Sequence, residues 1–196
     1  MSEICPVFPL STVLFPGGVL PLRIFEPRYL TMISECMRSG GEFAVALITK
    51  GSEAGQPAEF HQRATLARIV DFDRLDDGML GVTCTGTSMI EIGEHHLQPD
   101  NLIRARYTPV QDEPELSFDD QFERLREFLR QILNREEMRE YRQYFQEDWD
   151  SMVWISHRLS EFLPVSASSR QSLLECDTFE RMERLQLIFS NSKLIA

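Results

Sequence analysis

Short apolar runs separated by turn-forming residues fill the first half of the chain, and this pattern predicts a β-rich region. The runs are rich in β-branched and aromatic residues, which favour strands. We expect strands over residues 5–8, 19–24, 43–49, 64–73, 80–84, 89–92 and 103–110. The turn signals between them are residues 51–57, Asp76-Asp77-Gly78, Gly86, Gly93 and Pro99-Asp100-Asn101.

A proline-rich segment, residues 8–29, is predicted to form a strand, a tight turn and a second strand. Two apolar runs, Val13-Leu14-Phe15 and residues 19–22, flank Pro16-Gly17-Gly18. Proline presets φ in such a turn, and glycine tolerates positive φ. The segment also contains Pro9, Pro21 and Pro27, which lack the N–H that a fully paired strand needs. We therefore expect an irregular apolar ribbon that leaves main-chain groups available at an edge.

One helix is expected inside this β-rich half. Pro27 suits the first helical turn, because its missing N–H would have no helical partner there. Apolar residues then recur at helical spacing until Gly40-Gly41, which is predicted to stop the helix. These apolar positions are Tyr29, Leu30, Ile33, Cys36 and Met37.

From Asp112 onward the apolar positions follow a helical period. Ser117 and Asp120 resemble a capping box for the first helix, which is expected to end near Asn134. Its apolar stripe is Phe118, Phe122, Leu125, Leu129, Ile132 and Leu133. Further helices are predicted over residues 135–148, 151–163 and 168–175, and from the Asp177 cap to about residue 190.

A β-rich half followed by a helical half indicates the α+β class. The change of pattern near residue 112 coincides with a charged link that contains a proline, Asp112-Glu113-Pro114-Glu115. We therefore predict two subdomains, residues 1–111 and residues 112–196.

Residues 8–29 read FPLSTVLFPGGVLPLRIFEPRY, and this segment closely resembles the start of the substrate-binding (N-terminal) domain of ATP-dependent Lon proteases. The matching positions are Phe8-Pro9-Leu10, residues 13–17, Leu20-Pro21-Leu22 and residues 24–29. Weaker similarity follows at Asp76-Asp77-Gly78 and Leu173-Leu174-Glu175. The resemblance implies a PUA-like β pseudo-barrel with one helix, followed by a helical bundle, and a role in recognising polypeptides.

Size and composition are those of an ordinary globular protein. A chain of 196 residues buries about 70% of its unfolded surface. No apolar run approaches the ~20 residues that span a bilayer, and Met1-Ser2-Glu3 lacks the basic start of a signal peptide. The cysteines are far apart and are expected to be reduced and mostly buried: Cys5, Cys36, Cys84 and Cys176. We expect a cytoplasmic protein that does not engage a membrane.

Charge argues against nucleic acid as a partner. The net charge is −11, and such an acidic protein is repelled by phosphate backbones unless its cations cluster. Residues 112–150 carry 13 acidic side chains and six Arg, which reads as a solvated face or as a docking face for basic partner segments. Lys50 and Lys193 are the only lysines, so lysine chemistry is nearly excluded.

The ATPase and peptidase motifs of Lon proteases are not found in this sequence. Lys50-Gly51-Ser52 does not fit the GxxxxGK[ST] loop that cradles nucleotide phosphates. Neither lysine lies in a motif that resembles the Ser–Lys peptidase site. The chain looks like a free-standing recognition domain, so we expect it not to be an enzyme and to need no cofactor.

Other catalytic and metal sites find weak support. Adjacent residues on an extended segment point to opposite faces, so His95 and His96 would not reach one metal ion. The acidic positions Asp71, Asp73, Asp76 and Asp77 lack a calcium-loop register and suit a strand end with a hairpin turn. His157 is expected to be a packing residue. A hydrolase that uses His157 with a nearby carboxylate stays an alternative, as does an RNA-binding PUA-like protein.

A receptor for unfolded polypeptides needs a shallow apolar groove and a sheet edge rather than a catalytic group. The candidate peptide-binding residues are Phe15, Pro16, Leu20, Arg23, Phe25, Arg28, Tyr29 and Met32. Partners would be unfolded or flexible polypeptide segments, with a separate protease or chaperone as a further candidate. Lon domains commonly carry an Arg-Phe pair after the strand that ends at Gly86, where this chain has Ser88-Met89, so ligand preference is expected to differ from that of Lon.

Overall fold

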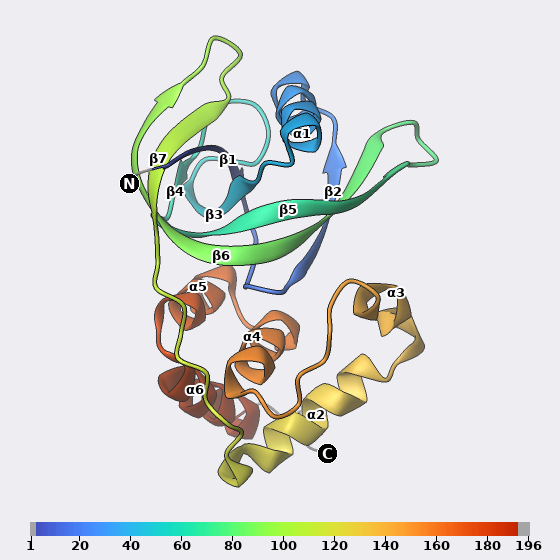
Figure 1. Ribbon diagram of the computed structural model, residues 1–196, viewed down its shortest axis with the longest axis vertical. Coiled ribbons are helices and arrows are strands. Elements are labelled where there is room, and N and C mark those ends of the chain that lie inside the picture. Colours follow the sequence, from blue (N-terminus) through green and yellow to red (C-terminus); the bar gives the residue numbers. More distant parts are fainter. Residues whose placement is uncertain (1–2, 192–196) are drawn as a thin grey trace. The chain divides into compact units, whose positions relative to one another are not determined.

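The computed structural model describes residues 3–191 and contains two compact units, of which the first ends at Gln111 and the second begins at Asp112 (Figure 1). The first unit is a sheet with one helix, and the second is helical. This architecture confirms the predicted α+β class.

The first unit is a seven-stranded sheet that curls back on itself. Its strands are β1 (Glu3–Leu10), β2 (Val19–Ile24), β3 (Phe43–Lys50), β4 (Glu59–Phe60), β5 (Arg63–Arg74), β6 (Leu80–Leu97) and β7 (Ile103–Pro109). The strand order is β1-β7-β6-β5-β3-β4, and β2 pairs with β6. Because β1 pairs antiparallel with β7 and parallel with β3, the sheet forms a pseudo-barrel.

The hairpin predicted around Pro16-Gly17-Gly18 is half correct. The turn is present, since the Gly18 N–H donates to the Phe15 carbonyl and Gly17 has a φ of 70°. The predicted strand over Val13-Leu14-Phe15 is wrong: this segment is irregular, and the buried Thr65 hydroxyl donates to the Leu14 carbonyl at 2.6 Å. The strand after the turn pairs with β6 instead.

Gly86 was predicted to be a turn, but it lies within the continuous strand β6. A Cβ atom at this position would lie 2.2 Å from the carbonyl oxygen of Phe15. Glycine is therefore needed there for the close approach of two backbone segments, a role that sequence pattern alone does not separate from a turn. Gly93, also predicted to be a turn, lies where the pairing of β6 with β7 shifts register.

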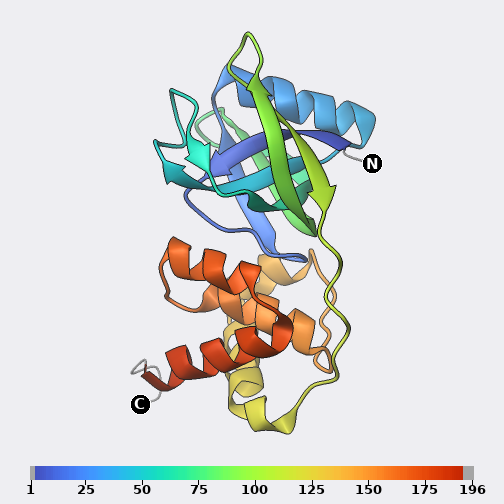
Figure 2. The same ribbon diagram turned by 90° about the vertical axis from the view of Figure 1, so that its left-hand side faces the viewer.

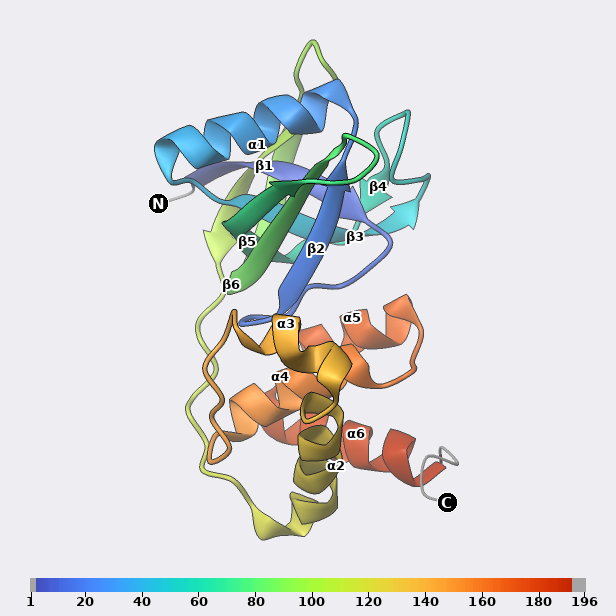
Figure 3. The same ribbon diagram turned by 90° about the vertical axis from the view of Figure 1, so that its right-hand side faces the viewer.

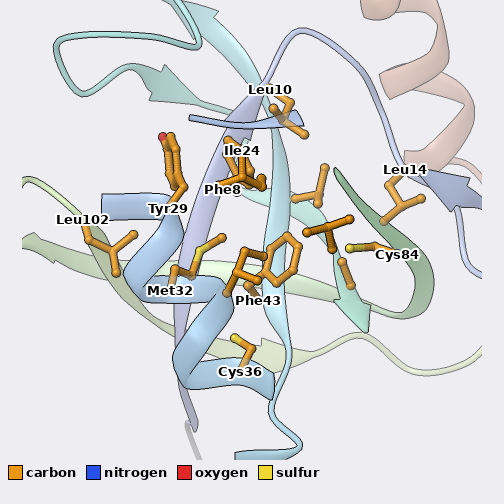
Figure 4. Packing of buried hydrophobic residues seen from close by; sticks show 14 residues of the cluster. Phe8, Leu10, Leu14, Ile24, Tyr29, Met32, Cys36, Phe43, Cys84 and Leu102 are labelled. Carbon is orange, nitrogen blue, oxygen red and sulfur yellow. The ribbon is translucent and has the colours of Figure 1, made fainter. Parts of the chain in front are cut away.

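A buried core fills the space between α1 (Pro27–Ser39) and the strands (Figure 4). The rings of Phe8 and Tyr29 stack with centroids 3.9 Å apart, and Met32 is fully buried beneath them. The helix ends as predicted at Gly40, which has a φ of 66°. Cys36 and Cys84 belong to this core and are free thiols, as expected.

The second unit contains five α-helices within residues 112–191. They are α2 (Glu123–Leu133), α3 (Arg139–Arg142), α4 (Met152–Phe162), α5 (Ala167–Glu175) and α6 (Thr178–Asn191). Figure 2 shows this helical unit in yellow to red. Ser151 caps α4 through a hydrogen bond from the Trp154 N–H, and Asp177 accepts from the Glu180 N–H at the start of α6.

Two helix predictions in this unit need correction. The long helix expected over residues 135–148 is reduced to a 3-10 turn, Glu136–Met138, and the single turn of α3. The residue that caps the first helical segment is Asp119, which accepts from the Gln121 N–H, rather than Ser117. Ser117 instead forms an isolated β-bridge with Ser151.

Candidate functional site

An apolar groove lies in the first unit among β1, β2 and the start of α1. We call it the β2 groove, and it has a volume of about 350 Å³. Its lining residues are Phe8, Leu10, Thr12, Leu20, Pro21, Leu22, Arg23, Phe25, Glu26, Tyr29 and Glu53. The lining is mainly aromatic and aliphatic, with a few charged groups, as in sites that bind flexible ligands.

The local sequence explains how the apolar wall forms. Leu20 and Leu22 alternate along β2, so both are partly buried against the same core. Phe25 follows the strand and leaves 58% of its surface exposed, which is unusual for a phenylalanine. Tyr29 lies one helical turn later and stacks on Phe8, so the floor of the groove is rigid.

Charged residues at the groove differ in how firmly they are held. Arg28 is buried, its guanidinium lies 2.9 Å from the Glu26 carboxylate, and it donates to the Asn101 carbonyl. Glu53 accepts hydrogen bonds from both the backbone and the hydroxyl of Ser11. Burial raises the pKa of Tyr29 to about 12, so its phenol stays neutral.

Strand β2 is an edge strand among the described residues, since it pairs only with β6 (Figure 3). The Gly86 N–H donates to the Gly18 carbonyl at 2.8 Å. Main-chain bonding alternates along an antiparallel pair, so the main-chain groups of Val19, Pro21 and Arg23 point away from β6. Because Pro21 has no N–H, the outward-facing donors of this edge are the N–H groups of Val19 and Arg23, which are separated by the proline.

The structure brings together only some of the predicted peptide-binding residues. Leu20, Arg23, Phe25 and Tyr29 all line the β2 groove. Pro16 is half-buried and lies outside the lining of this groove.

Three other predicted residues are buried and do not fit a surface role. Phe15 and Met32 are fully buried, and Met32 is part of the core cluster. Arg28 is held beneath the groove by Glu26 and Asn101. An apolar residue in a recognition motif can serve the core instead of a ligand, and the sequence pattern does not distinguish these roles.

Several lining residues were missed by the sequence reasoning. Phe8 and Leu10 belong to the same FPL motif, and their proximity to β2 could have been inferred from it. Glu53 comes from the loop after β3 and reaches Ser11 across 42 positions of the chain. No local signal marks such a long-range contact.

His157 lies in a closed polar network of the helical unit. Its Nε2 is 3.2 Å from a carboxylate oxygen of Glu113, which also accepts two hydrogen bonds from Arg181 and one from Thr178. The imidazole is 4% exposed. The network satisfies its own groups and offers no open position to a substrate, which agrees with the expected packing role.

The ionisation of this network follows from burial and pairing. Burial lowers the pKa of His157 to about 4, against the opposing effect of the hydrogen bond that the imidazole makes to Glu113. Burial would raise the pKa of Glu113, but hydrogen bonds from His157 and Arg181 outweigh it and lower the value to about 2. At neutral pH the network therefore holds a neutral imidazole beside a paired carboxylate and guanidinium.

Within residues 3–191, no group of three or more His, Cys, Asp or Glu side chains could hold a metal ion. The ring of His95 packs against Phe60, with centroids 5.2 Å apart. No helix in the described part of the chain is both long and apolar enough to pass through a bilayer.

The features above define a class of protein: a pseudo-barrel with an apolar groove, joined in sequence to a helical unit. The family model of the "ATP-dependent protease La (LON) substrate-binding domain" matches residues 4–190. The chain belongs to the Lon substrate-binding domain family, as the resemblance of residues 8–29 suggested.

Solved structures agree with this assignment. A Lon N-terminal domain protein from Xanthomonas campestris has a TM-score of 0.76 and 30% identity, over 94% of this chain and 98% of that one. The N-terminal domain of a Mycobacterium avium complex Lon protease shares the fold, with a TM-score of 0.66 and 19% identity over 96% of this chain and 99% of that one.

Curated relatives match over a shorter length. The Lon protease of Desulfosudis oleivorans is 30% identical over 116 residues, which is 56% of this chain and 14% of that protein. Lon protease 2 of Myxococcus xanthus is 26% identical over 114 residues, 57% of this chain and 14% of that protein. The chain thus spans about one seventh of these relatives. The family model that matches this chain describes the substrate-binding domain rather than an ATPase or peptidase domain.

Proposed function

We propose that this protein binds non-native polypeptides through the β2 groove and does not cleave them. The observation that carries the proposal is an open apolar groove beside an unpaired strand edge, in a member of a substrate-binding domain family. Unfolded chains expose apolar side chains and unpaired main chain, and this site offers a partner for each.

Apolar contact supplies most of the expected affinity. Phe25 is 58% exposed, and covering it with a ligand side chain removes apolar surface from water. Such burial contributes about 1–2 kcal/mol for one aromatic side chain. Leu20, Leu22 and Tyr29 extend the same surface into the groove.

Main-chain contact adds orientation at the edge of β2. A bound segment can accept from the N–H groups of Val19 and Arg23, while Pro21 prevents a continuous ladder. Binding by short extended segments is therefore favoured over formation of a full extra strand. The two carboxylates of the groove lining are already engaged, Glu26 by Arg28 and Glu53 by Ser11, and this supports binding without cleavage.

The complete assembly in which this module works is also part of the proposal. The whole-length relatives are named Lon proteases. We expect the module to deliver bound polypeptides to a protease or chaperone. A phosphate backbone fits the groove poorly, since Glu26 and Glu53 line it beside Arg23.

Titration of a fluorescently labelled, permanently unfolded casein tests the proposal by anisotropy. Phe25→Ala should weaken binding about tenfold through lost apolar contact. Phe179→Ala on α6 is the matched control, because it removes an exposed phenylalanine that does not line the groove. Binding that is unchanged by Phe25→Ala, or weakened equally by both variants, would contradict the proposed site.

A further inference from the structure

A second groove lies next to the first, against the hairpin that joins β5 and β6. We call it the hairpin groove, and it has a volume of about 600 Å³. Its lining residues are Pro21, Leu22, Arg23, Asp71, Phe72, Asp73, Leu75, Asp76, Asp77, Gly81, Val82 and Thr83. Pro21, Leu22 and Arg23 line both grooves, so the two are contiguous along β2.

The floor of the hairpin groove is built by two rows of residues across three strands. Pro21 pairs with Thr83, which also pairs with Asp71. In the next row on the same face, Arg23 and Asp73 both pair with Gly81.

Asp71 and Asp73 stand at the outer ends of these rows and form the rim, whereas small and apolar residues form the base beside them. Leu75 folds over Gly81, because a Cβ atom on that glycine would lie 2.8 Å from a Leu75 methyl group. Pro21 and Leu75 therefore give the base an apolar surface, as a long side chain lying flat on it would require.

The rim of the hairpin groove is strongly acidic. Asp71, Asp73, Asp76 and Asp77 line it against a single cation, Arg23, which forms an ion pair with Asp77. Asp77 also accepts from the Met79 N–H and so helps to form the hairpin turn. The groove combines an apolar base with a net negative rim, which complements a cation on a long aliphatic stem.

We infer that the hairpin groove receives a lysine or arginine side chain of the polypeptide bound in the β2 groove. The inference rests on the proposed function, and it names the substrate class: extended segments in which a basic residue neighbours an apolar anchor. The methylene groups of the basic side chain lie along Pro21 and Leu75, and its charge reaches the carboxylates of Asp73 and Asp76.

Three labelled peptides that share one unstructured apolar sequence test the inference. They carry Lys, Gln or Glu at the same positions beside a Leu-Phe anchor, and their binding to the full chain is measured by fluorescence anisotropy. The Lys peptide should bind about fivefold more tightly than the Gln peptide at low salt, and the Glu peptide should bind least tightly. The difference should shrink as ionic strength rises.

A double variant, Asp73→Asn with Asp76→Asn, should remove the preference for Lys and leave the affinity for the Gln peptide unchanged. The control pair is Glu136→Gln with Glu137→Gln, which changes the net charge equally on an exposed turn of the helical unit. A Lys preference that survives the first variant, or that falls equally in the control, would overturn the inference.

The experiment also separates this inference from the function beneath it. Equal binding of the Lys and Gln peptides, with both weakened by Phe25→Ala, would overturn the basic-residue assignment and leave the β2 groove supported. Absence of binding by all three peptides would overturn both proposals.

Discussion

At the scale of single residues, a glycine inside a strand is closely constrained by a neighbouring backbone segment. Gly86 lets the turn at Phe15 approach β6, and its N–H and carbonyl bond to Gly18 and Gly17. This contact fixes the start of β2, which is the strand that lines both grooves. Glycine is therefore required by geometry rather than by flexibility.

Gly86→Ala should destabilise the protein strongly, because its methyl carbon would lie 2.2 Å from the Phe15 carbonyl oxygen. We expect a loss of about 2–4 kcal/mol in the free energy of unfolding, the range of a severe buried clash. Urea denaturation followed by circular dichroism measures it.

Gly93→Ala in the same strand provides the matched control. A Cβ atom there would find its nearest neighbour, the Arg106 carbonyl oxygen, at 3.6 Å, an ordinary contact. This substitution should change stability by less than about 1 kcal/mol. Equal losses for the two variants would show that strand propensity, and not the close approach at Gly86, sets the cost.

At the scale of elements, local signals predicted well wherever an element depends on its neighbours in sequence. The turn at Pro16-Gly17, the stop of α1 at Gly40 and the Asp177 cap of α6 are all decided within a few residues. The continuity of β6 through Gly86 was not predictable, because the partner of that glycine is Phe15, about seventy positions away in the sequence.

In the candidate site too, some residues were predictable from their neighbours in sequence and others depend on distant parts of the chain. Leu20, Arg23 and Phe25 were proposed from the apolar and charged character of residues 8–29, and all three line the β2 groove. The roles of Glu53 and of the hairpin groove depend on which strands lie beside β2. No local sequence pattern predicts that strand pairing. Phe15 and Met32 were proposed for the site and are buried, a feature that the sequence does not show because burial, unlike periodicity, depends on the whole fold.

The Glu113 network ties the start of the helical unit to its later helices. Glu113 precedes the first helical segment, while His157 lies on α4 and Arg181 on α6. Removing one partner would leave a buried charge without compensation, which is costly. The network therefore holds the start of the helical unit against α4 and α6.

Acid should lower the free energy of unfolding through protonation of His157 in the unfolded chain. Its pKa is lowered from 6.5 to about 4 in the folded state, chiefly by burial. The unfolded chain then binds more protons than the folded one as pH falls from 6.5 toward 4, so stability declines across that window. At pH 5 the contribution of this group should be a loss of roughly 2 kcal/mol relative to pH 7.

His157→Gln isolates the effect, because glutamine can still donate to Glu113 but does not titrate. The variant should be less stable than the parent at pH 7, yet its free energy of unfolding should change less between pH 7 and pH 5. Guanidinium denaturation at both pH values measures the two slopes. An unaltered slope in the variant would assign the acid sensitivity to other groups.

At the scale of the whole molecule, both grooves proposed to bind polypeptides belong to the first unit. The lining of the β2 and hairpin grooves falls entirely within residues 8–83. The two hydrophobic clusters of the sheet likewise draw all their members from residues before Gln111. The proposed binding surface thus draws no lining residue from the helical unit.

This independence predicts that residues 1–111 fold alone and bind. The fragment keeps every member of its core clusters and ends where the chain divides into two compact units. It should unfold cooperatively on heating and bind unfolded casein within about threefold of the full chain, because the groove residues are all retained. Residues 112–196, prepared as the matched fragment, should not bind. If the first fragment folds but does not bind casein, the groove residues alone are not sufficient for binding. Essential contacts would then lie in the helical unit.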